Sequence, residues 1–480
     1  MKKIFITTPI FYVNDSPHIG HAYTTIICDA LAKFYSLDEY DVLFTTGTDE
    51  HGQKVEKAAK KVNSDPKVFV DKVSENFVNL TKRLKISNTD FVRTTEERHM
   101  KAAKKFWEIL KEKNQIYLSK YEGWYSVRDE AFYQEKELIN KNGKLYTSEG
   151  EEVQWIEEES FFFKLSEWGE KLLKYFEKNP DFILPLSRRN EVISFVKSGL
   201  KDLSISRTSF KWGIKVEGTK NHIMYVWIDA LVNYLTSINF PNTSDEQFLF
   251  WENCNHIIGK DILKFHAIYW PAMLMAANIP LPKKIFAHGW WTNEGKKISK
   301  SVGNVIDPNL MIDKYGLDQL RYFLLREVTL GQDGDFSEFS FKARINADLS
   351  NNFGNLVQRT LKFTGKNFEN KMPYELDEPK ENDLLSEVYE LYPKVRANIE
   401  DFQINKAIEE IFILLTKLNK FMDKSEPWKS IKTNHESAAK DLSILIESFR
   451  VIGILLQPFL PDASNNVLNI LNIEKKKQKV

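Results

Sequence analysis

Residues 11–34 read FYVNDSPHIGHAYTTIICDALAKF, and this stretch with its two flanks decides the fold. Apolar side chains recur at helical spacing from Ala22 to Phe34. The flanking segments 4–8 (IFITT) and 42–46 (VLFTT) are typical of short buried strands. A strand, a helix and a second strand in this order predict a β-α-β unit, and therefore an α/β domain with a parallel sheet.

The start of the predicted helix carries two histidines around a glycine. A helix N-terminus exposes N–H groups and about half a positive charge, so it is a natural seat for phosphate. Gly20 lets the backbone approach closely, and the His18 and His21 imidazoles can donate to phosphoryl oxygens as negative charge develops. Paired histidines are equally typical of capping or packing, so this stretch alone leaves both interpretations open.

A second stretch, NEGKKISKSVGN at residues 293–304, places Lys297 and Lys300 three apart among glycines and serines. This pattern predicts a mobile cationic loop able to close on a polyphosphate. Lysine-rich loops are more often plain solvated turns. The two stretches together favour a phosphate site more strongly than either does alone.

Patterning also divides the rest of the chain. Short aromatic and acidic segments at residues 115–221 indicate an insertion that splits one α/β domain into residues 1–114 and 222–290. Residues 291–340 contain the lysine loop, and helical periodicity predicts a helix bundle over residues 341–480.

Composition excludes several classes of protein. No apolar run in the 480 residues approaches the roughly 20 needed to span a bilayer, and Pro9, Asn14 and Asp15 interrupt the N-terminal run before a signal-peptide cleavage site. Cys28 and Cys254 lie in apolar surroundings, which favours a reducing, cytoplasmic location without disulfides. Lys+Arg and Asp+Glu both total 67, so net charge indicates nothing about partners.

The two phosphate-site stretches resemble the paired signatures of class I aminoacyl-tRNA synthetases, His-Ile-Gly-His and Lys-Met-Ser-Lys-Ser, with Ile298 in place of the methionine. Within that class the chain resembles the methionyl-tRNA synthetase family over nearly its whole length. The resemblance rests on the segments TTPIFYVNDSPHIGHAYT, TGTDEHGQKV, YVWIDALVNY, GKDILKFHAIYWPAML, HGWWTNEGKKISKS and GNLVQRT.

The resemblance implies a reaction and an architecture. Methionine and ATP, as its Mg²⁺ complex, would form a methionyl-adenylate with release of pyrophosphate, and the methionyl group would pass to the terminal ribose of methionine tRNA. The family's fold combines a doubly wound catalytic domain, an inserted connective subdomain, a stem-contact region and an α-helical anticodon-binding domain. These parts correspond to the ranges 1–114 with 222–290, 115–221, 291–340 and 341–480.

Family motifs also imply the ATP site. His18, Gly20 and His21 would hold the phosphates, and Lys297 and Lys300 would stabilise the transferring phosphate and the departing pyrophosphate. No general base is needed, because the methionine carboxylate is already a nucleophile.

The adenosine would contact the segment Gly259–Asp261, which follows an apolar, strand-like run. Gly259 permits close approach, and the Asp261 carboxylate can bond ribose hydroxyls. Without the other motifs this segment would be an ordinary turn.

The implied methionine pocket combines apolar and aromatic walls with one carboxylate, Asp49, for the substrate ammonium. Its residues are Ile10, Tyr12, Asp49, Trp227, Ala230, Leu231, Tyr234, His266 and Trp270. Residues 227, 230, 231 and 234 share one face of a predicted helix, a pattern that usually means plain core. Leu231 stands where some relatives have proline, and Asp49 lies in TDEHG, which taken alone could ligate a metal.

The helix bundle carries the residues that the resemblance assigns to the anticodon. Asn355 and Arg359, four residues apart on one predicted helix, would read base edges, and Trp428, which follows Pro427 at a helix start, would stack on a base. Composition alone favours a buried tryptophan and two surface polar residues.

No metal is expected. Many relatives hold zinc in cysteine knuckles of the insertion, but Ser126 and Asp129 occupy the positions of one such pair here. We therefore predict no structural zinc, and we expect aromatic residues such as Trp124 and Trp155 to hold the insertion together.

Three alternatives differ in expected layout. A synthetase for a branched apolar amino acid would normally have a much longer editing insertion, and a smaller nucleotidyltransferase would lack the helix bundle. A non-catalytic tRNA-binding paralogue is disfavoured, because both phosphate-site motifs keep their charged residues and glycines.

The chain ends soon after the bundle, without the extra domain through which some relatives dimerise, which predicts a monomer.

Overall fold

The computed structural model describes residues 2–14, 16–128, 131–148, 150–298, 303–376 and 383–479. The chain divides into two compact units. The first, here called the sheet unit, comprises residues 3–17 and 43–287. The second, the helical unit, comprises residues 1–2, 18–42 and 288–480.

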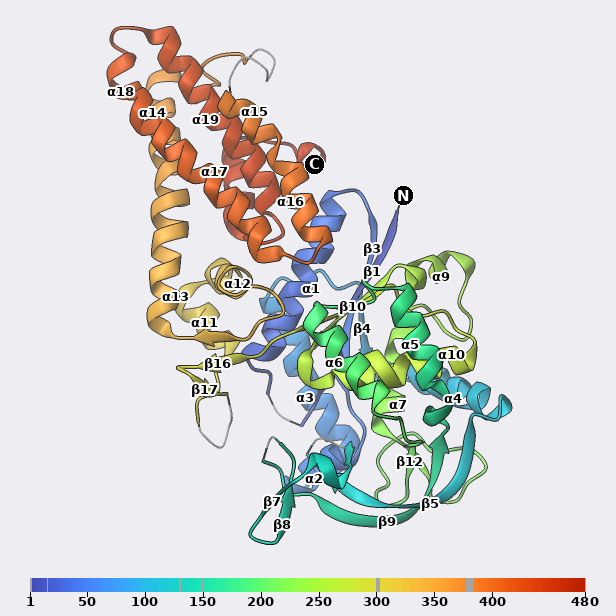
Figure 1. The fold of residues 1–480 in the computed structure, drawn as a ribbon. Helices are drawn as coiled ribbons and strands as arrows, with labels where there is room; N and C mark the ends of the chain where they lie inside the picture. The colour runs from blue at the N-terminus through green and yellow to red at the C-terminus, as the bar shows by residue number, and fades with distance from the viewer. Residues whose placement is uncertain are drawn as a thin grey trace. The chain divides into compact units, whose positions relative to one another are not determined.

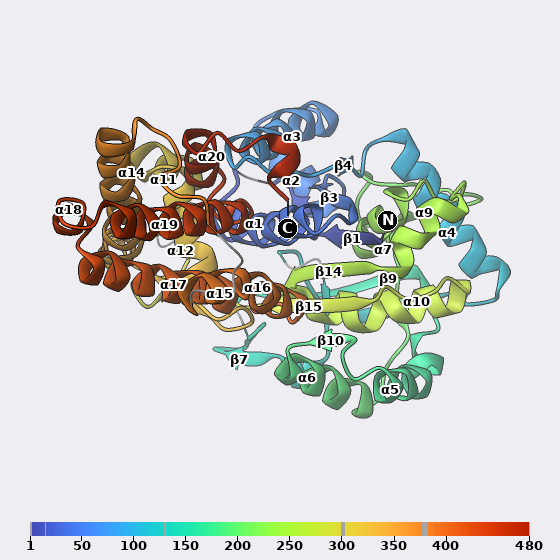
Figure 2. The ribbon, with the colours of Figure 1, turned by 90° about the horizontal axis from the view of Figure 1, so that it is seen from above.

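A parallel sheet forms the centre of the sheet unit. Within the described residues it has seven strands in the order β10-β15-β14-β1-β3-β2, with β4 also paired to β3. The pairs β1–β14, β10–β15, β2–β3 and β3–β4 are all parallel, and Figure 2 shows β14 and β15 side by side. The strands are β1 (Lys3–Thr7), β2 (Phe11–Tyr12), β3 (Asp41–Asp49), β4 (Asp90–Arg93), β10 (Ile183–Leu184), β14 (Cys254–Gly259) and β15 (Lys284–His288).

The predicted β-α-β unit is confirmed. Strands β1 and β3 are neighbours in the sheet, and helix α1 (Ile19–Leu37) separates them in the sequence. Every residue of β14 is buried, as expected for a central strand of a parallel sheet that is covered on both faces.

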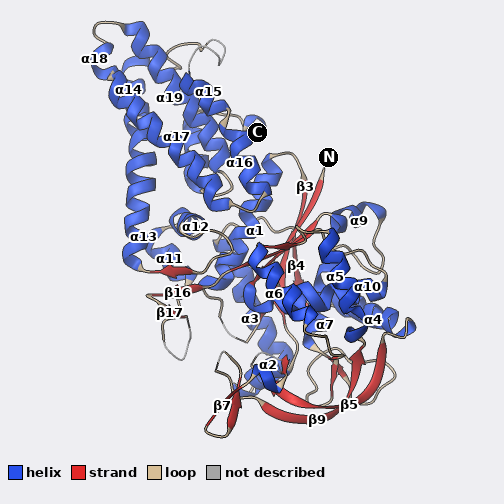
Figure 3. Cartoon of the chain, viewed as in Figure 1, coloured by secondary structure: helices blue, strands red, loops and turns tan. Residues whose placement is uncertain are grey.

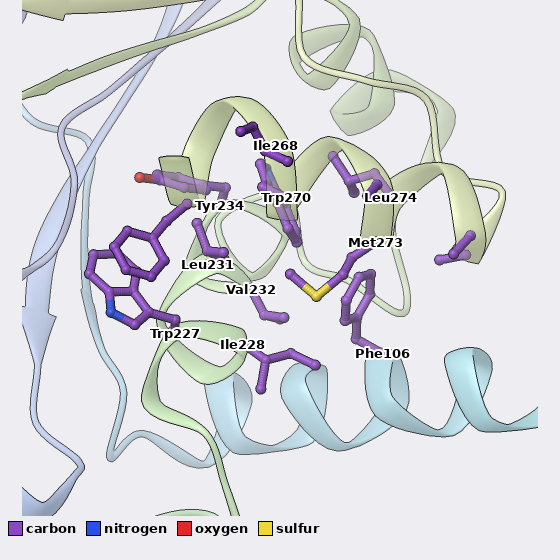
Figure 4. Close-up of a cluster of buried hydrophobic side chains, with 14 of the residues drawn as sticks. Phe106, Trp227, Ile228, Leu231, Val232, Tyr234, Ile268, Trp270, Met273 and Leu274 are labelled. Carbon is purple, nitrogen blue, oxygen red and sulfur yellow. The ribbon is translucent and has the colours of Figure 1, made fainter. Parts of the chain in front are cut away.

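Helices of the sheet unit supply most of its apolar core. Phe106 of α4 packs against Trp270 of α10 with ring centroids 5.6 Å apart, and Figure 4 shows both beside Met273 and Ile228. The helices are α2 (Gln53–Lys61), α3 (Pro66–Arg83), α4 (Glu97–Glu112), α5 (Gly169–Lys178), α6 (Leu186–Lys197), α7 (Val226–Leu231), α8 (Asn233–Thr236), α9 (Asp245–Glu252) and α10 (Trp270–Ala277).

The segment predicted as an insertion contains a second, antiparallel sheet. Its order is β11-β9-β5-β6, and the long strands β5 (Ile116–Ser126) and β9 (Gln154–Phe163) curve together in Figure 1. Trp124 of β5 and Trp155 of β9 pack edge to face with ring centroids 5.1 Å apart. Strand β10 lies in the same segment but pairs with β15 of the parallel sheet. The shorter strands of this segment are β6 (Ala131–Tyr133), β7 (Ile139–Lys141), β8 (Lys144–Tyr146), β11 (Leu203–Ser204) and β12 (Ser206–Arg207). Strand β13 (Ile223–Met224) follows the segment and pairs with β12.

The helical unit ends in a bundle of helices, shown in blue in Figure 3, as the periodicity predicts. Leu415 and Leu418 of α17 and Leu442 and Leu445 of α19 are fully buried at helical spacing. The bundle comprises α14 (Asn355–Phe368), α15 (Asp383–Tyr389), α16 (Leu391–Glu400), α17 (Ile404–Ser425), α18 (Pro427–Ser430), α19 (His435–Leu456) and α20 (Pro461–Ile470). Before it come β16 (Trp291–Asn293), β17 (Lys296–Lys297), α11 (Pro308–Tyr315), α12 (Leu317–Arg326), β18 (Gly334–Phe336), α13 (Glu338–Arg344) and a π-helix (Ile345–Gly354).

A buried ion pair fixes α1 within the helical unit. The Arg321 guanidinium of α12 lies 2.7 Å from the Asp29 carboxylate of α1, and both side chains are completely buried. Arg321 also donates to the Pro458 carbonyl oxygen at 2.7 Å, while Asp318 accepts from the Ala463 N–H at the start of α20. The helix that begins at the two histidines is therefore joined by charged groups to the end of the bundle.

Candidate active site

Helix α1 begins with a capping box made by the two histidines. His18 Nδ1 accepts from the Gly20 N–H at 3.1 Å, and His21 Nδ1 accepts from the His18 N–H at 3.0 Å. The two rings stack with centroids 3.9 Å apart. Because both Nδ1 atoms are acceptors, each neutral ring carries its proton on Nε2. Capping therefore sets both rings in the tautomer whose Nε2 is a donor, and the capping and phosphate-binding interpretations are compatible.

Gly20 is required by the histidine geometry. A Cβ atom at this position would lie 2.9 Å from His18 Cε1 and 3.1 Å from His18 Nδ1. The His18 ring lies across the space that any other side chain would occupy, so glycine permits the capping bond itself.

The lysine loop follows a short hairpin of the helical unit. Strands β16 and β17 pair antiparallel, with Asn293 opposite Lys296. Asp335 accepts from the Gly295 N–H at 2.8 Å, and Asn293 donates to the Asn304 carbonyl oxygen at 2.9 Å, so both ends of the loop are held. The Lys297 side chain and the whole of Lys300 lie outside the described residues.

The predicted adenosine residues lie at the end of a central strand. Gly259 is the last residue of β14, and Asp261 is exposed in the 3₁₀-helix Lys260–Ile262 that follows. The predicted strand before Gly259 is confirmed, and it ends at the carboxyl edge of the sheet, where open α/β folds bind their ligands.

Rings of the predicted methionine pocket form a continuous chain of contacts inside the sheet unit. Tyr12 packs edge to face against Trp227 with ring centroids 6.2 Å apart, and the centroids of Trp227 and His266 lie 6.3 Å apart. Tyr234 lies 5.8 Å from His266 and 6.3 Å from Trp270. Figure 4 shows Trp227, Tyr234 and Trp270 around Leu231. The structure therefore brings these residues together, although they come from three segments of the chain.

The remaining pocket residues border the same region. Ala230 and Leu231 are buried on α7. Ile10 is half-buried before β2, and Asp49 is 2 % exposed at the end of β3, opposite Tyr12 in the strand pairing.

Tyr234 and His266 are joined by a hydrogen bond that fixes both groups. His266 Nδ1 donates to the Ile262 carbonyl oxygen at 3.0 Å, so His266 Nε2 accepts from the Tyr234 hydroxyl at 2.8 Å. Burial lowers the pKa of His266 to about 4. The imidazole is therefore neutral near pH 7, and the tyrosine oxygen keeps its lone pairs for a neighbouring group.

Local helix geometry differs from the prediction at two places. The predicted single helix face over residues 227–234 is divided between α7 and α8, because the Asn233 side chain donates to the Ala230 carbonyl oxygen at 2.7 Å and competes with the backbone. Residues Phe265–Tyr269 form a π-helix ahead of Trp270. Such wide turns in helices often occur at functional sites.

Asp49 begins a loop whose next two side chains turn to other partners. Glu50 is fully buried and accepts two hydrogen bonds from Arg93, at 2.6 and 3.0 Å. His51 Nδ1 lies 2.7 Å from the Asp229 carboxylate. Within the described ranges, no three His, Cys, Asp or Glu side chains form a group that could hold a metal ion.

Several residues of the site were not predicted from the sequence. Phe265 stacks on Trp227 with centroids 3.7 Å apart and planes 6° apart. His256 of β14 packs 4.1 Å from Tyr234 and shares a hydrogen bond with Thr7. Phe265 directly precedes the predicted His266, so examining the sequence neighbours of the predicted pocket residues could have found Phe265. No spacing pattern connects His256 to the predicted pocket residues.

The predicted anticodon residues lie on the surface of the helical unit. Asn355 and Arg359 are on the first two turns of α14, where Arg359 lies 3.5 Å from Asp423. Trp428 follows Pro427, the first residue of α18, and its side chain is 38 % exposed. This exposure excludes the alternative that Trp428 is a buried core residue.

The expectation of no structural zinc rests on Ser126 and Asp129. Ser126 is buried at the end of β5, and Asp129 lies outside the described residues. The absence of zinc stays a prediction.

A family model described as "tRNA synthetases class I (M)" matches residues 4–361. The match covers more than half of the chain, which is therefore a class I aminoacyl-tRNA synthetase. A second model, "Anticodon binding domain of methionyl tRNA ligase", matches residues 375–479.

Relatives narrow the class to one family. The chain is 51 % identical to the methionine–tRNA ligase of Rickettsia felis, over 99 % of this chain and 93 % of that protein. It is 47 % identical to the ligase of Brucella suis over the same shares. Mycobacterium tuberculosis methionyl-tRNA synthetase, solved with methionyl-adenylate, superposes with a TM-score of 0.97 at 44 % identity, covering 100 % of this chain and 96 % of that one. The chain belongs to the methionyl-tRNA synthetase family.

Proposed function

We propose that this methionine–tRNA ligase activates methionine with ATP and transfers it to tRNA, and that the residues predicted under Sequence analysis carry out these steps. One observation carries the proposal: the match along the whole chain to an enzyme solved with methionyl-adenylate, at a TM-score of 0.97 and 44 % identity. ATP is taken as its magnesium complex, and methionine tRNA is the acceptor.

The first step needs positioning and charge stabilisation rather than a base. The start of α1 supplies its dipole and the donor Nε2 atoms of His18 and His21 to the phosphates. Lys297 and Lys300, on the loop held by Asn293 and Asp335, stabilise the pentavalent α-phosphate and the departing pyrophosphate. Gly259 and Asp261 hold the adenosine.

Methionine recognition combines one charge with polarizable walls. The buried Asp49 carboxylate pairs with the substrate ammonium, and the Tyr234 hydroxyl, held by His266, faces the thioether. Aromatic walls suit sulfur, because a thioether makes favourable contacts at ring edges. A neutral His266 avoids placing a positive charge beside an apolar side chain.

Recognition of tRNA is assigned to the bundle. Trp428 stacks on an anticodon base, and Asn355 and Arg359 read base edges.

The monomeric state, the cytoplasmic location and the domain limits given under Sequence analysis stay predictions. No helix in the described ranges has the length and hydropathy to cross a bilayer.

Exchange of labelled pyrophosphate into ATP tests the proposal. Exchange should depend on methionine and should be far weaker with each of the other nineteen amino acids. Strongest exchange with valine, leucine or isoleucine would favour the alternative synthetases. Exchange with no amino acid would favour a paralogue that only binds tRNA.

A further inference from the structure

Asp229 is a buried carboxylate on the same helix as three residues of the methionine wall. Trp227, Ala230 and Leu231 share α7 with it, and Asp229 is only 1 % exposed. At 100° per residue, its side chain leaves the helix about 160° away from Trp227 and Leu231. Asp229 therefore lies on the face of α7 opposite Trp227 and Leu231, and the proposed function gives it no role.

Two imidazoles from distant segments meet this carboxylate. His51 Nδ1 lies 2.7 Å from Asp229 Oδ2, and His99 Nε2 lies 2.8 Å from Asp229 Oδ1. His51 is 5 % exposed and His99 is completely buried. His51 comes from the loop that begins at Asp49, and His99 from α4, so one side chain joins three elements of the sheet unit.

The carboxylate stays ionised in this environment. Burial alone would raise the pKa of Asp229, but the charges and hydrogen bonds of His51 and His99 outweigh burial and lower that pKa to about 2. An ionised carboxylate only accepts, so both imidazoles must donate to it. Hydrogen bonds to an ionised acceptor are short and strong, and they fix the orientation of both rings.

The loop is held by its backbone as well. The Trp212 Nε1–H donates to the Glu50 carbonyl oxygen at 2.6 Å, and the Val13 N–H donates to the Asp49 carbonyl oxygen at 3.2 Å. Asp49 and His51, two residues apart, therefore lie on one short, fixed loop, and the orientation of one side chain is coupled to that of the other through its backbone.

We propose that Asp229, through His51 and His99, is a positioning residue for methionine. It sets the place of the Asp49 carboxylate relative to the α7 wall, and so the distance between the subsites for the ammonium and for the side chain. The inference rests on the proposed function, since it needs both subsites to bind one methionine. None of the three residues touches a reacting atom.

Asp229→Asn tests this role, because it keeps the side-chain shape but removes the charge and turns one acceptor into a donor that faces an imidazole N–H. The KM for methionine in pyrophosphate exchange should rise about tenfold, since small misplacements of binding groups cost affinity steeply. The KM for ATP should stay within about twofold.

A second pair of variants leaves Asp229 in place, and it serves if Asp229→Asn does not fold. His51→Gln keeps an N–H donor for Asp229 and should keep a methionine KM near that of the wild type. His51→Leu removes the donor and should reproduce the tenfold rise. The matched control is Asp318→Asn, which changes a buried carboxylate of α12 that accepts from the Ala463 N–H at the start of α20, and it should lower the melting temperature without changing the methionine KM.

The possible outcomes separate the two claims. A selective rise in the methionine KM with Asp229→Asn and His51→Leu, but not with His51→Gln, supports the positioning role. Equal changes in both KM values, or only a loss of folded protein, would overturn it while the wild type remained active. Absence of methionine-dependent exchange in the wild type would instead overturn the proposed function.

Discussion

At the scale of single residues, histidine has two opposite roles in this chain. His18 and His21 accept backbone N–H groups at Nδ1, which makes each Nε2 a donor suited to phosphate oxygens. His266 donates from Nδ1 to a carbonyl oxygen, which makes its Nε2 an acceptor for Tyr234. The sequence motif predicts which histidines matter, but local hydrogen bonds decide what each can do.

His266 predicts a pH dependence of stability. Its folded pKa of about 4 lies below its ordinary value of 6.5, because burial disfavours the charged ring. The unfolded chain therefore binds a proton between these values that the folded chain does not. Stability from this group is complete above pH 6.5 and is lost as the pH falls toward 4, by up to about 3 kcal/mol.

His266→Gln should flatten this dependence. Denaturant unfolding at pH 7.5 and pH 5 should show a smaller difference in unfolding free energy for the variant than for the wild type. Some dependence should remain, because burial and His266 also lower the pKa of His256. An unchanged difference would mean that His266 titrates normally in the folded chain.

At the scale of elements, periodicity predicted the right helices and strands wherever apolar spacing alone decides them. Strand β1, helix α1 and strand β3 agree with the prediction to within a few residues. The prediction failed where a side chain competes with the backbone, as Asn233 does between α7 and α8. It also missed the π-helix at Phe265–Tyr269, because a wider turn leaves no mark in a short apolar run.

Gly20→Ala tests the start of α1. The added Cβ would meet the His18 ring at 2.9 Å and displace the capping box, so the rate of adenylate formation should fall by about 10–100-fold. The melting temperature should change little, because the higher helix propensity of alanine offsets the stability that is lost with the cap.

Gly169→Ala is the matched control, since a Cβ there meets its nearest neighbours at an ordinary 3.8 Å. Single-turnover adenylate formation should match the wild type for this variant. Equal rates for Gly20→Ala and Gly169→Ala would show that the histidine geometry does not control the phosphate site.

At the scale of the whole molecule, the sequence motifs predicted the class and family because each motif is local. Long-range polar links could not be predicted in this way. Asp229 lies 178 residues from His51 and 130 residues from His99, and no spacing rule connects them. The predicted methionine residues belong to the sheet unit, and the predicted anticodon residues belong to the helical unit.

Trp428→Ala should separate recognition from chemistry. Stacking of a base on an aromatic side chain is worth about 1–3 kcal/mol, so the efficiency of aminoacylation should fall by roughly one to two orders of magnitude. Methionine-dependent pyrophosphate exchange needs no tRNA and should stay near the wild-type value.

Ile413→Ala, which trims another exposed apolar residue of the bundle, is the control and should change neither activity. A parallel fall of exchange, aminoacylation and melting temperature in Trp428→Ala would remove Trp428 from the anticodon site and assign it to stability.

The central claim, ligation of methionine to tRNA through an adenylate, is tested most directly by a two-step quench experiment. The protein is first mixed with methionine and ATP labelled at the α-phosphate, and methionine tRNA is then added. We predict stoichiometric methionyl-adenylate before the addition, followed by loss of the adenylate as methionyl-tRNA and AMP appear at equal rates. Failure to form the adenylate with methionine, or its persistence after the tRNA is added, would contradict the account.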